Sequence, residues 1–224
     1  MRIPRLSPPR AGIFFGGNIV AAVVATIAHV TRGIHAIILA AGQAKRFGRA
    51  KLLAELHGVP LLHHALNAAR DVCGHNTWLV TGHSAEKIED TARGLAGHLV
   101  HNPEYAKGIG SSIACGATAC SERAHAIVIM LADQPLVSRS HLASLVSTWT
   151  GDADAIIATE FAGVLGPPVL FGRDHFAELC ELRGDAGARQ ILETHTDAVT
   201  SVRFEAAAVD IDTPEDLERL VRRD

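Results

Sequence analysis

Residues 39–51, LAAGQAKRFGRAK, place two glycines and four cationic side chains directly after the apolar run IHAIIL. Gly42 and Gly48 permit tight turns in which backbone N–H groups face an anion. The cations, which supply charge and bidentate donors for phosphate oxygens, are Lys45, Arg46, Arg49 and Lys51. The stretch predicts a binding loop for a polyphosphate, against the alternative of a solvated basic turn on the surface.

This loop differs from the two common phosphate-binding motifs. Five residues separate Gly42 from Gly48 and no Gly-Lys-Ser/Thr follows, so it is not a Walker A loop, and GxGxxG spacing is absent as well. Kinase and dehydrogenase interpretations therefore lose their main support. Because the loop follows the predicted strand 34–39, we expect it at the carboxyl edge of an open α/β sheet, where such sheets bind ligands.

Three aspartates offer the hard oxygen ligands that Mg²⁺ needs if it is to bridge nucleotide phosphates. Asp133, in MLADQPLV, follows the apolar strand predicted at 127–131, so we expect it to face the same sheet edge as the loop. Asp210 and Asp212, in VDIDTPEDL, are two residues apart on a predicted strand and so share one face. One of these two completes a metal site with Asp133 in this hypothesis, and the other contributes to the cap of the last helix. Taken alone, Asp133 is equally compatible with an aspartate that only begins a turn.

Composition limits the classes of protein to be considered. The 224 residues are 48% hydrophobic and carry a formal net charge of -3, which suits one domain with a sizeable core and gives no field that attracts nucleic acid or an anionic membrane. The four cysteines show neither CxxC pairing nor disulfide-scaffold spacing, so we expect reduced thiols and a cytoplasmic protein. The thirteen histidines are scattered, and ordinary core and surface roles are favoured over a metal site.

The N-terminal segment stands apart from the rest of the chain. Residues 11–30 carry no formal charge and are long enough to span a membrane, but three glycines, Asn18 and His29 weaken that interpretation. A packed extra helix or a simple extension is favoured over a membrane segment. We expect residues 1–33 to be an N-terminal extension and residues 34–224 to form the functional domain.

Elements that position the candidate residues follow a regular alternation. Apolar β-branched runs alternate with helical patterns, which predicts βαβ units around a largely parallel sheet. Strands are expected at 34–39, 76–82, 98–102, 125–133, 152–160 and 198–204, with helices at 60–70, 84–95, 111–120, 138–149, 173–182 and 185–195. Residues 163–171, GVLGPPVLF, predict a turn and a short strand, and Thr213 with Pro214 predicts a capped final helix.

Several segments together resemble a known family over nearly the whole length from Ile34. They are LAAGQAKRFGRAK, NPEYAKGIGSSIACG, LADQPLV, GPPVLF, GDAGARQIL and VDIDTPEDL. The chain resembles the nucleotidyltransferases of molybdenum cofactor maturation, specifically the molybdenum cofactor cytidylyltransferase type among MobA/MocA-like NTP transferases. The resemblance implies a Rossmann-like, three-layer α/β/α fold with a mostly parallel mixed sheet. Ala44 stands where the family usually carries Ser, and the first 33 residues match nothing in the pattern.

The resemblance also implies a reaction and roles for residues. A nucleoside monophosphate passes from a triphosphate to a phosphate on the acceptor, molybdenum cofactor, and pyrophosphate leaves, with no protein nucleophile. Lys51 and Arg46 cover the triphosphate, while Asp133, with Asp210 or Asp212, holds Mg²⁺. The nucleotide-binding residues implied are Leu39, Ala40, Ala41, Gly42, Arg46, Lys51, Ser112 and Asp133. The acceptor-binding residues implied are Gly166, Pro167, Gly184, Asp185 and Arg189.

Ser112 in GIGSSIACG is implied to contact the nucleotide base, although Ser111 and Ser112 equally fit a capped helix start. The LAAG form, with Ala41, is typical of cytidylyl enzymes, whereas guanylyl relatives usually carry Gly there, so CTP is favoured over GTP.

Three alternatives remain open. The first is an enzyme of the same fold that acts on a sugar phosphate or an isoprenoid-precursor alcohol phosphate. The second is a serine hydrolase, which the absence of G-x-S-x-G disfavours. The third is a cofactor-carrying chaperone that docks transiently to a molybdenum hydroxylase. An intact Lys51 and Asp133 favour catalysis over carriage alone.

Overall fold

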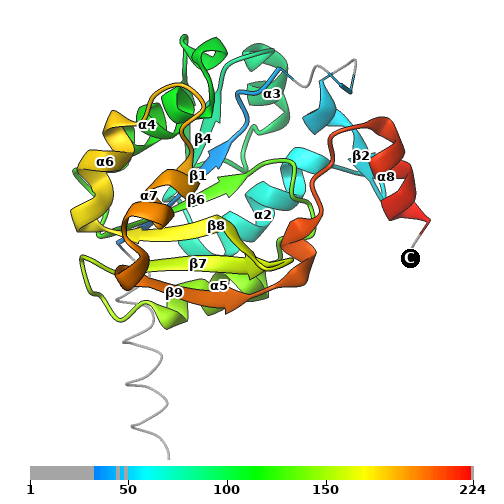
Figure 1. Ribbon diagram of the computed structural model, residues 1–224. Helices are drawn as coiled ribbons and strands as arrows, with labels where there is room; N and C mark the ends of the chain where they lie inside the picture. Colours follow the sequence, from blue (N-terminus) through cyan, green and yellow to red (C-terminus); the bar gives the residue numbers. More distant parts are fainter. Residues whose placement is uncertain (1–32, 44–45, 48–49, 223–224) are drawn as a thin grey trace, which may run out of the picture.

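The computed structural model describes residues 33–43, 46–47 and 50–222, which build one seven-stranded sheet in the order β5-β4-β1-β6-β8-β7-β9 (Figure 1). Within this described sheet only β8 runs antiparallel to its neighbours. The strands are β1 Ile34–Leu39, β4 Thr77–Thr81, β5 His98–His101, β6 Ala126–Leu131, β7 Ile156–Phe161, β8 Val164–Gly172 and β9 Val199–Arg203, and β2 Glu55–Leu56 pairs separately with β3 Val59–Pro60. The mostly parallel mixed sheet confirms the expected fold class.

Helices cover both faces of the sheet and make three layers. On one face lie α2 Leu61–Cys73, α3 Ala85–Thr91 and α5 Arg139–Thr148; on the other lie α4 Ile109–Cys120, α6 Phe176–Glu181 and α7 Ala188–Thr194. Short 3-10 helices are η1 Lys51–Leu53, η2 Tyr105–Lys107, η3 Arg173–His175, η4 Thr196–Ala198 and η5 Glu205–Ala208, and α8 Pro214–Val221 is the last described helix.

The inner strand β1 shows why the sheet is buried on both faces. Ile34 and Ile38 pack into the core beneath α2 and α5, whereas Ile37 and Leu39 pack against α4, α6 and α7. All six residues of β1 are buried, as a run of continuous apolar character requires when helices cover both sides. The predicted βαβ alternation is therefore the three-layer arrangement seen in Figure 1.

The predicted turn is present at Gly163, but the strand that follows it is longer than expected. This strand, β8, has nine residues and lies inside the sheet between β6 and β7. Prolines are rare in such strands because they lack a backbone N–H. Here the β7–β8 register passes from Ala158 opposite Val169 to Thr159 opposite Gly166, so Pro167 and Pro168 fall in a bulge that needs no ladder donors.

The predicted strand at VDID is also wrong. Residues 209–212 form no strand and run as an irregular connection toward α8. Ile211 is fully buried in a small apolar cluster with Phe47 and Leu217, and its N–H donates to the carbonyl of Asp133 at 3.1 Å. Tertiary packing of one isoleucine thus fixes this segment. The predicted cap is confirmed, because Thr213 and Asp216 form a reciprocal capping box.

The N-terminal segment 1–32, with the uncharged residues 11–30, lies outside the described residues. Within the part of the chain that the structure describes, every helix is too short or too polar to cross a bilayer.

Two buried histidines are held neutral in the core. The Nε1 of Trp78 donates to Nδ1 of His35 at 2.9 Å, and Nε2 of His141 lies 2.8 Å from Oγ1 of Thr159 while the His141 ring stacks on Phe204. The pKa of each is lowered to about 4, by loss of solvation for His141, and for His35 by loss of solvation together with the positive charge of nearby groups. Both are therefore uncharged near neutral pH.

These histidines predict a loss of stability on acidification. In the unfolded chain a histidine has a pKa near about 6.5, so between about pH 6.5 and 4 the unfolded state binds more protons. The stabilisation is complete above the unfolded value and falls as the pH drops toward the folded one. His141→Gln should flatten this slope, measured by urea unfolding at about pH 7 and about pH 5. A variant with the wild-type slope would contradict the assignment to His141.

Candidate active site

The candidate site is a cleft of about 310 Å³ at the carboxyl ends of the adjacent parallel strands β1 and β6. The chain leaves β1 at Leu39 and β6 at Leu131, so the two segments that follow meet at one edge of the sheet, as open α/β sheets require of a ligand site. The predicted residues that line this cleft are Leu39, Ala40, Ala41, Gly42, Lys51, Ser112 and Asp133. Arg46 lines an adjoining hollow together with Lys51 and Asp212.

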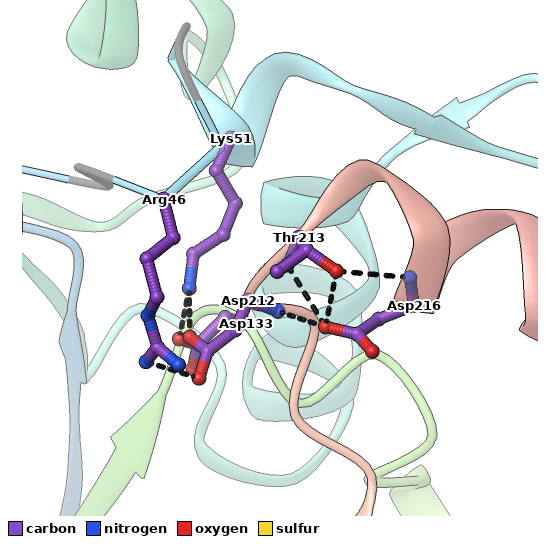
Figure 2. A network of polar contacts seen from close by, with 6 residues as sticks. All are labelled: Arg46, Lys51, Asp133, Asp212, Thr213 and Asp216. Atoms are coloured by element: carbon purple, nitrogen blue, oxygen red, sulfur yellow. Dashed lines mark hydrogen bonds and ion pairs between the residues drawn. The ribbon is translucent and has the colours of Figure 1, made fainter.

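Lys51 lies between two of the predicted carboxylates (Figure 2). Its Nζ lies 2.7 Å from Oδ2 of Asp133 and 3.1 Å from Oδ1 of Asp212, and an Arg46 guanidinium nitrogen lies 2.6 Å from Oδ2 of Asp212. The cations and carboxylates therefore alternate in the order Arg46, Asp212, Lys51 and Asp133, and the two aspartates come from distant parts of the sequence. Lys51 begins η1 and only 9% of it is exposed, so it is not a side chain of an exposed loop.

The electrostatics of the site favour the charged form of Lys51. Burial alone would lower the pKa of the Lys51 ammonium, but Asp133 and Asp212 outweigh it and the pKa lies above its usual value. For Asp210 it is the neutral form that is favoured. Desolvation, followed by the negative charge of Asp133, raises the pKa of its carboxyl to about 6, although the residue remains exposed to solvent. Aspartate charges are thus concentrated around one buried ammonium.

The start of α8 holds Asp212 in place. The Asp216 carboxylate accepts from the N–H of Asp212 at 3.2 Å and from the N–H and hydroxyl of Thr213 at 2.9 Å (Figure 2). The Ile211 N–H bond to the Asp133 carbonyl then brings the two aspartates to the same place. The capping box and one buried isoleucine, rather than a strand, position Asp212.

The carboxylates fit a divalent cation. Asp133 and Asp212 present hard oxygen donors that converge on the Lys51 ammonium, and a cation of higher charge suits the same set of donors. Asp210 is near enough for Asp133 to raise its pKa, but the described contacts do not join it to Lys51 or Arg46. Of the two aspartates left open by the sequence, Asp212 is the one that the network includes.

Ser112 lines the cleft and is held there by a buried polar cluster that sequence analysis did not identify. The Asn102 side-chain amide donates to the hydroxyls of Ser111 and Ser112 at 3.0 Å each, and its carbonyl accepts from the Glu104 N–H at 2.9 Å. Ser111 in turn donates to the Gly108 carbonyl at 2.8 Å. In the described part of the chain no carbonyl or carboxylate accepts the Ser112 proton, so that hydroxyl is left to donate into the cleft.

Gly108 and Gly110 allow two distant segments to touch. A Cβ on Gly108 would lie 2.2 Å from the Gly184 carbonyl, and one on Gly110 would lie 2.6 Å from the Ala186 carbonyl. The Gly110 N–H donates to the Gly184 carbonyl at 2.9 Å. The predicted acceptor residues Gly184 and Asp185 therefore lie beside the Gly108 wall of the cleft.

The remaining acceptor candidates are Gly166 and Pro167 on β8 and Arg189 on α7, and they differ in their position relative to this edge of the sheet. Val169 pairs with Ile129, and β8 runs antiparallel to β6, so Pro167 and Gly166 lie farther toward the end of β6 that Asp133 follows. Arg189 is exposed on α7 and pairs with Glu193 one turn on, at 2.9 Å, and it does not line the cleft. Its role in acceptor binding stays a prediction.

His83 and Ser84 line the cleft and were missed in the sequence. They follow β4, the third parallel strand that ends at this edge, and the His83 N–H donates to the Ala41 carbonyl at 3.2 Å. Ser84 has a φ of 57°, a left-handed conformation uncommon outside glycine. The signal available was position: TGHS follows a strand parallel to the one before LAAG.

Comparison with known proteins agrees with this geometry. Residues 36–199 match the MobA-like NTP transferase domain. The purine catabolism protein PucB of Bacillus subtilis (strain 168) is 31% identical over 203 residues, which cover 84% of this chain and 95% of PucB. The bifunctional protein GlmU of Geotalea uraniireducens (strain Rf4) is 33% identical over 113 residues, half of this chain and 25% of that protein.

A solved structure of the Rv0371c homologue from Mycobacterium sp. strain JC1 superposes with a TM-score of 0.72 at 31% identity, covering 86% of this chain and 96% of that one. Rv0371c of Mycobacterium tuberculosis in complex with manganese has a TM-score of 0.68 at 26% identity, with 85% and 98% covered. The family match indicates a nucleotidyltransferase, and the solved structures share its Rossmann-like architecture. Because the matching domain covers most of the sequence, the chain belongs to the MobA-like NTP transferase family.

The buried amide of Asn102 generates a stability prediction. Asn102→Ala removes the donor to two serine hydroxyls and the acceptor of a backbone N–H, so the free energy of unfolding should fall by about 1 to 3 kcal/mol. Ser112→Ala should cost less, about 1 kcal/mol, because it removes one of these hydrogen bonds and leaves those to Ser111 and Glu104 in place. Chemical denaturation of the two variants measures the difference. Equal losses would show that Asn102 does not organise both serines.

Proposed function

We propose that the chain transfers CMP from CTP to the phosphate of molybdenum cofactor, in a Mg²⁺-dependent reaction that releases pyrophosphate. The observation that carries the proposal is the buried Lys51 ammonium between Asp133 and Asp212 in a cleft walled by LAAG and Ser112. Cations and carboxylates converging in this way suit a triphosphate bound with a divalent metal. The choice of CTP rests on Ala41 in LAAG, and the choice of acceptor rests on the family's motifs.

In this reaction each residue has a distinct task. Arg46 and Lys51 neutralise phosphate oxygens as negative charge shifts toward the leaving pyrophosphate. Asp133 and Asp212 hold the Mg²⁺, which supplies charge neutralisation across the phosphates. The Ser112 hydroxyl, aligned by Asn102, hydrogen-bonds to the base, and the backbone of residues 39–42 approaches the nucleotide. The loop with Gly184 and Asp185, together with Gly166 and Pro167 of β8, bounds the acceptor side.

The proposal also includes the location of the protein, its partner and the part of the chain that carries the activity. The chain acts in the cytoplasm, and the free thiols of Cys73, Cys115, Cys120 and Cys180 accord with that. After transfer it docks transiently to a molybdenum hydroxylase. Residues 34–224 carry the activity and residues 1–33 are dispensable, since the described sheet begins at Ile34.

A second reaction of the same kind is favoured by one observation. The second candidate is transfer of a nucleotide to a sugar phosphate through the same cleft, and the observation that favours it is the match to GlmU over half of this chain. Pyrophosphate release distinguishes the two. The purified chain, with Mg²⁺, is tested with CTP or GTP against molybdenum cofactor and, separately, against sugar 1-phosphates. Release with CTP and molybdenum cofactor supports the proposal. Release only with a sugar phosphate, or no release with any pair, contradicts it.

Asp133→Asn should abolish most of this turnover. The amide keeps the side-chain volume but loses the negative charge that holds the metal, so kcat should fall by roughly 100-fold or more. Asp197→Asn, on the exposed η4, is the matched control and should keep wild-type rates. Wild-type turnover in Asp133→Asn at saturating Mg²⁺ would remove Asp133 from the site.

Lys51→Met should reduce kcat/KM for CTP and GTP in similar proportion, because its ammonium faces the carboxylates rather than Ser112. The expected loss is roughly 100-fold or more. Stability should fall by about 1 to 2 kcal/mol, since Asp133 and Asp212 are partly exposed and lose their shared counter-charge. Added Mg²⁺ should restore part of that loss in thermal melts.

The control for Lys51→Met is Lys87→Met, which removes an exposed ammonium from α3. A folded Lys51→Met enzyme with an unchanged rate, or one that loses only CTP use, would show that this lysine does not bind the triphosphate.

A further inference from the structure

A second cluster of ligating side chains lies at the opposite edge of the sheet from the cleft. His175 ends η3, Glu178 is on α6, and His195 follows α7, and one ligating atom from each lies within 4.8 Å of the other two. β8 leads to this cluster from Gly172, which pairs with Ala126 at the start of β6, whereas Asp133 follows the end of β6. The cluster is therefore separate from the candidate active site.

One ring nitrogen of His175 is buried and makes no hydrogen bond within the described residues. The Nε2 of His175 lies 2.8 Å from the Asp154 carbonyl oxygen, which only accepts, so Nε2 carries the proton and Nδ1 keeps its lone pair. His175 is 1% exposed, and its Nδ1 makes no hydrogen bond with any described residue. A buried lone pair without a donor costs free energy unless something else satisfies it.

The other two residues of the cluster, Glu178 and His195, already contact each other where a metal ion would be held. The Nε2 of His195 lies 2.8 and 3.0 Å from the two Glu178 carboxylate oxygens, and the His195 ring meets the His175 ring edge-on with centroids 4.8 Å apart. A proton between nitrogen and carboxylate occupies the place that a metal ion takes in such a set. Both side chains are partly exposed, at 29% and 44%, so an ion can reach them.

We propose that His175, Glu178 and His195 form a binding site for a divalent transition metal, of which Zn²⁺ fits best. Two imidazoles and one carboxylate are a common protein donor set for Zn²⁺, with a fourth position for water. Donor atoms of a tetrahedral zinc site lie about 3.4 Å apart, so the longest separation here closes by at most about 1.4 Å. The Asp154 carbonyl fixes the His175 tautomer as outer partners of zinc-bound histidines do.

The position of this site gives it a structural task. α6 and α7 form a hairpin whose connecting residues 183–187 abut Gly108 and Gly110 at the cleft, while His175 precedes α6 and His195 follows α7. A metal bound by all three residues joins the two ends of the hairpin farthest from the cleft. It thereby stabilises the support of the loop that carries Gly184 and Asp185.

The test is zinc binding by the purified full chain after removal of metal, in excess Mg²⁺ to occupy the carboxylates of the cleft. Titration against a competing chromophoric chelator should give one zinc equivalent in wild type. At zinc 100 times its Kd, the melting temperature should rise by roughly 5 to 10 °C. Co²⁺ bound in its place should give the visible absorption of tetrahedral cobalt.

His195→Gln should lose the zinc equivalent, the thermal shift and the cobalt spectrum. Glu178→Gln should do the same and serves if His195→Gln fails to fold. Glu181→Gln, on the same helix but outside the cluster, is the matched control, and Asp212→Asn controls for the cleft; both should retain the equivalent. The proposal is overturned if wild type binds no zinc in excess Mg²⁺. It is equally overturned if folded His195→Gln and Glu178→Gln bind as wild type does, or if Asp212→Asn alone abolishes binding.

Discussion

The charge balance around Lys51 is the constraint that the rest of the site depends on. A buried ammonium is costly unless opposite charge surrounds it, and here two carboxylates do so from chain positions 82 and 161 residues away. Those carboxylates need the ammonium equally, since without it two negative charges would face each other. The loop after β1, the end of β6 and the start of α8 are thus held together by one set of ion pairs. The same charges that stabilise this junction are the ones a metal-bound triphosphate would reorganise.

Much of this arrangement was predictable because the carboxyl ends of parallel strands meet at one edge. Asp133 and residues 40–42 follow adjacent strands, so their meeting at this edge could be inferred from the order of the strands. The placement of Asp212 was not predictable on the grounds used, since the strand inferred at 209–212 does not form. What brings Asp212 to Lys51 is the burial of Ile211 and the capping box at Thr213, and packing of this kind has no periodic signal in the sequence.

The role of Asn102 and the bulge in β8 were missed for the same physical reason. The Asn102 amide donates hydrogen bonds to two serines that follow it in the chain by nine and ten residues. Its role therefore exists only once β5 and α4 are packed together. The bulge that admits Pro167 and Pro168 into β8 depends likewise on register with β7. Motif reading found the segments that contain these residues, NPEY and GPPVLF, but local pattern does not reveal which atoms they satisfy. Polar satisfaction is a property of the folded chain.

The division of the sheet into two edges explains how one small domain can separate chemistry from support. At the carboxyl edge, the ion pairs of Lys51 and Arg46 join the loop after β1, the end of β6 and the start of α8. The opposite wall of the cleft is supported by other elements. The α6–α7 hairpin reaches the cleft through residues 183–187, and Gly108 and Gly110 let its backbone approach closely enough to donate and accept hydrogen bonds. Its other end carries His175, Glu178 and His195, so this wall of the cleft is connected through the hairpin to the opposite edge of the sheet.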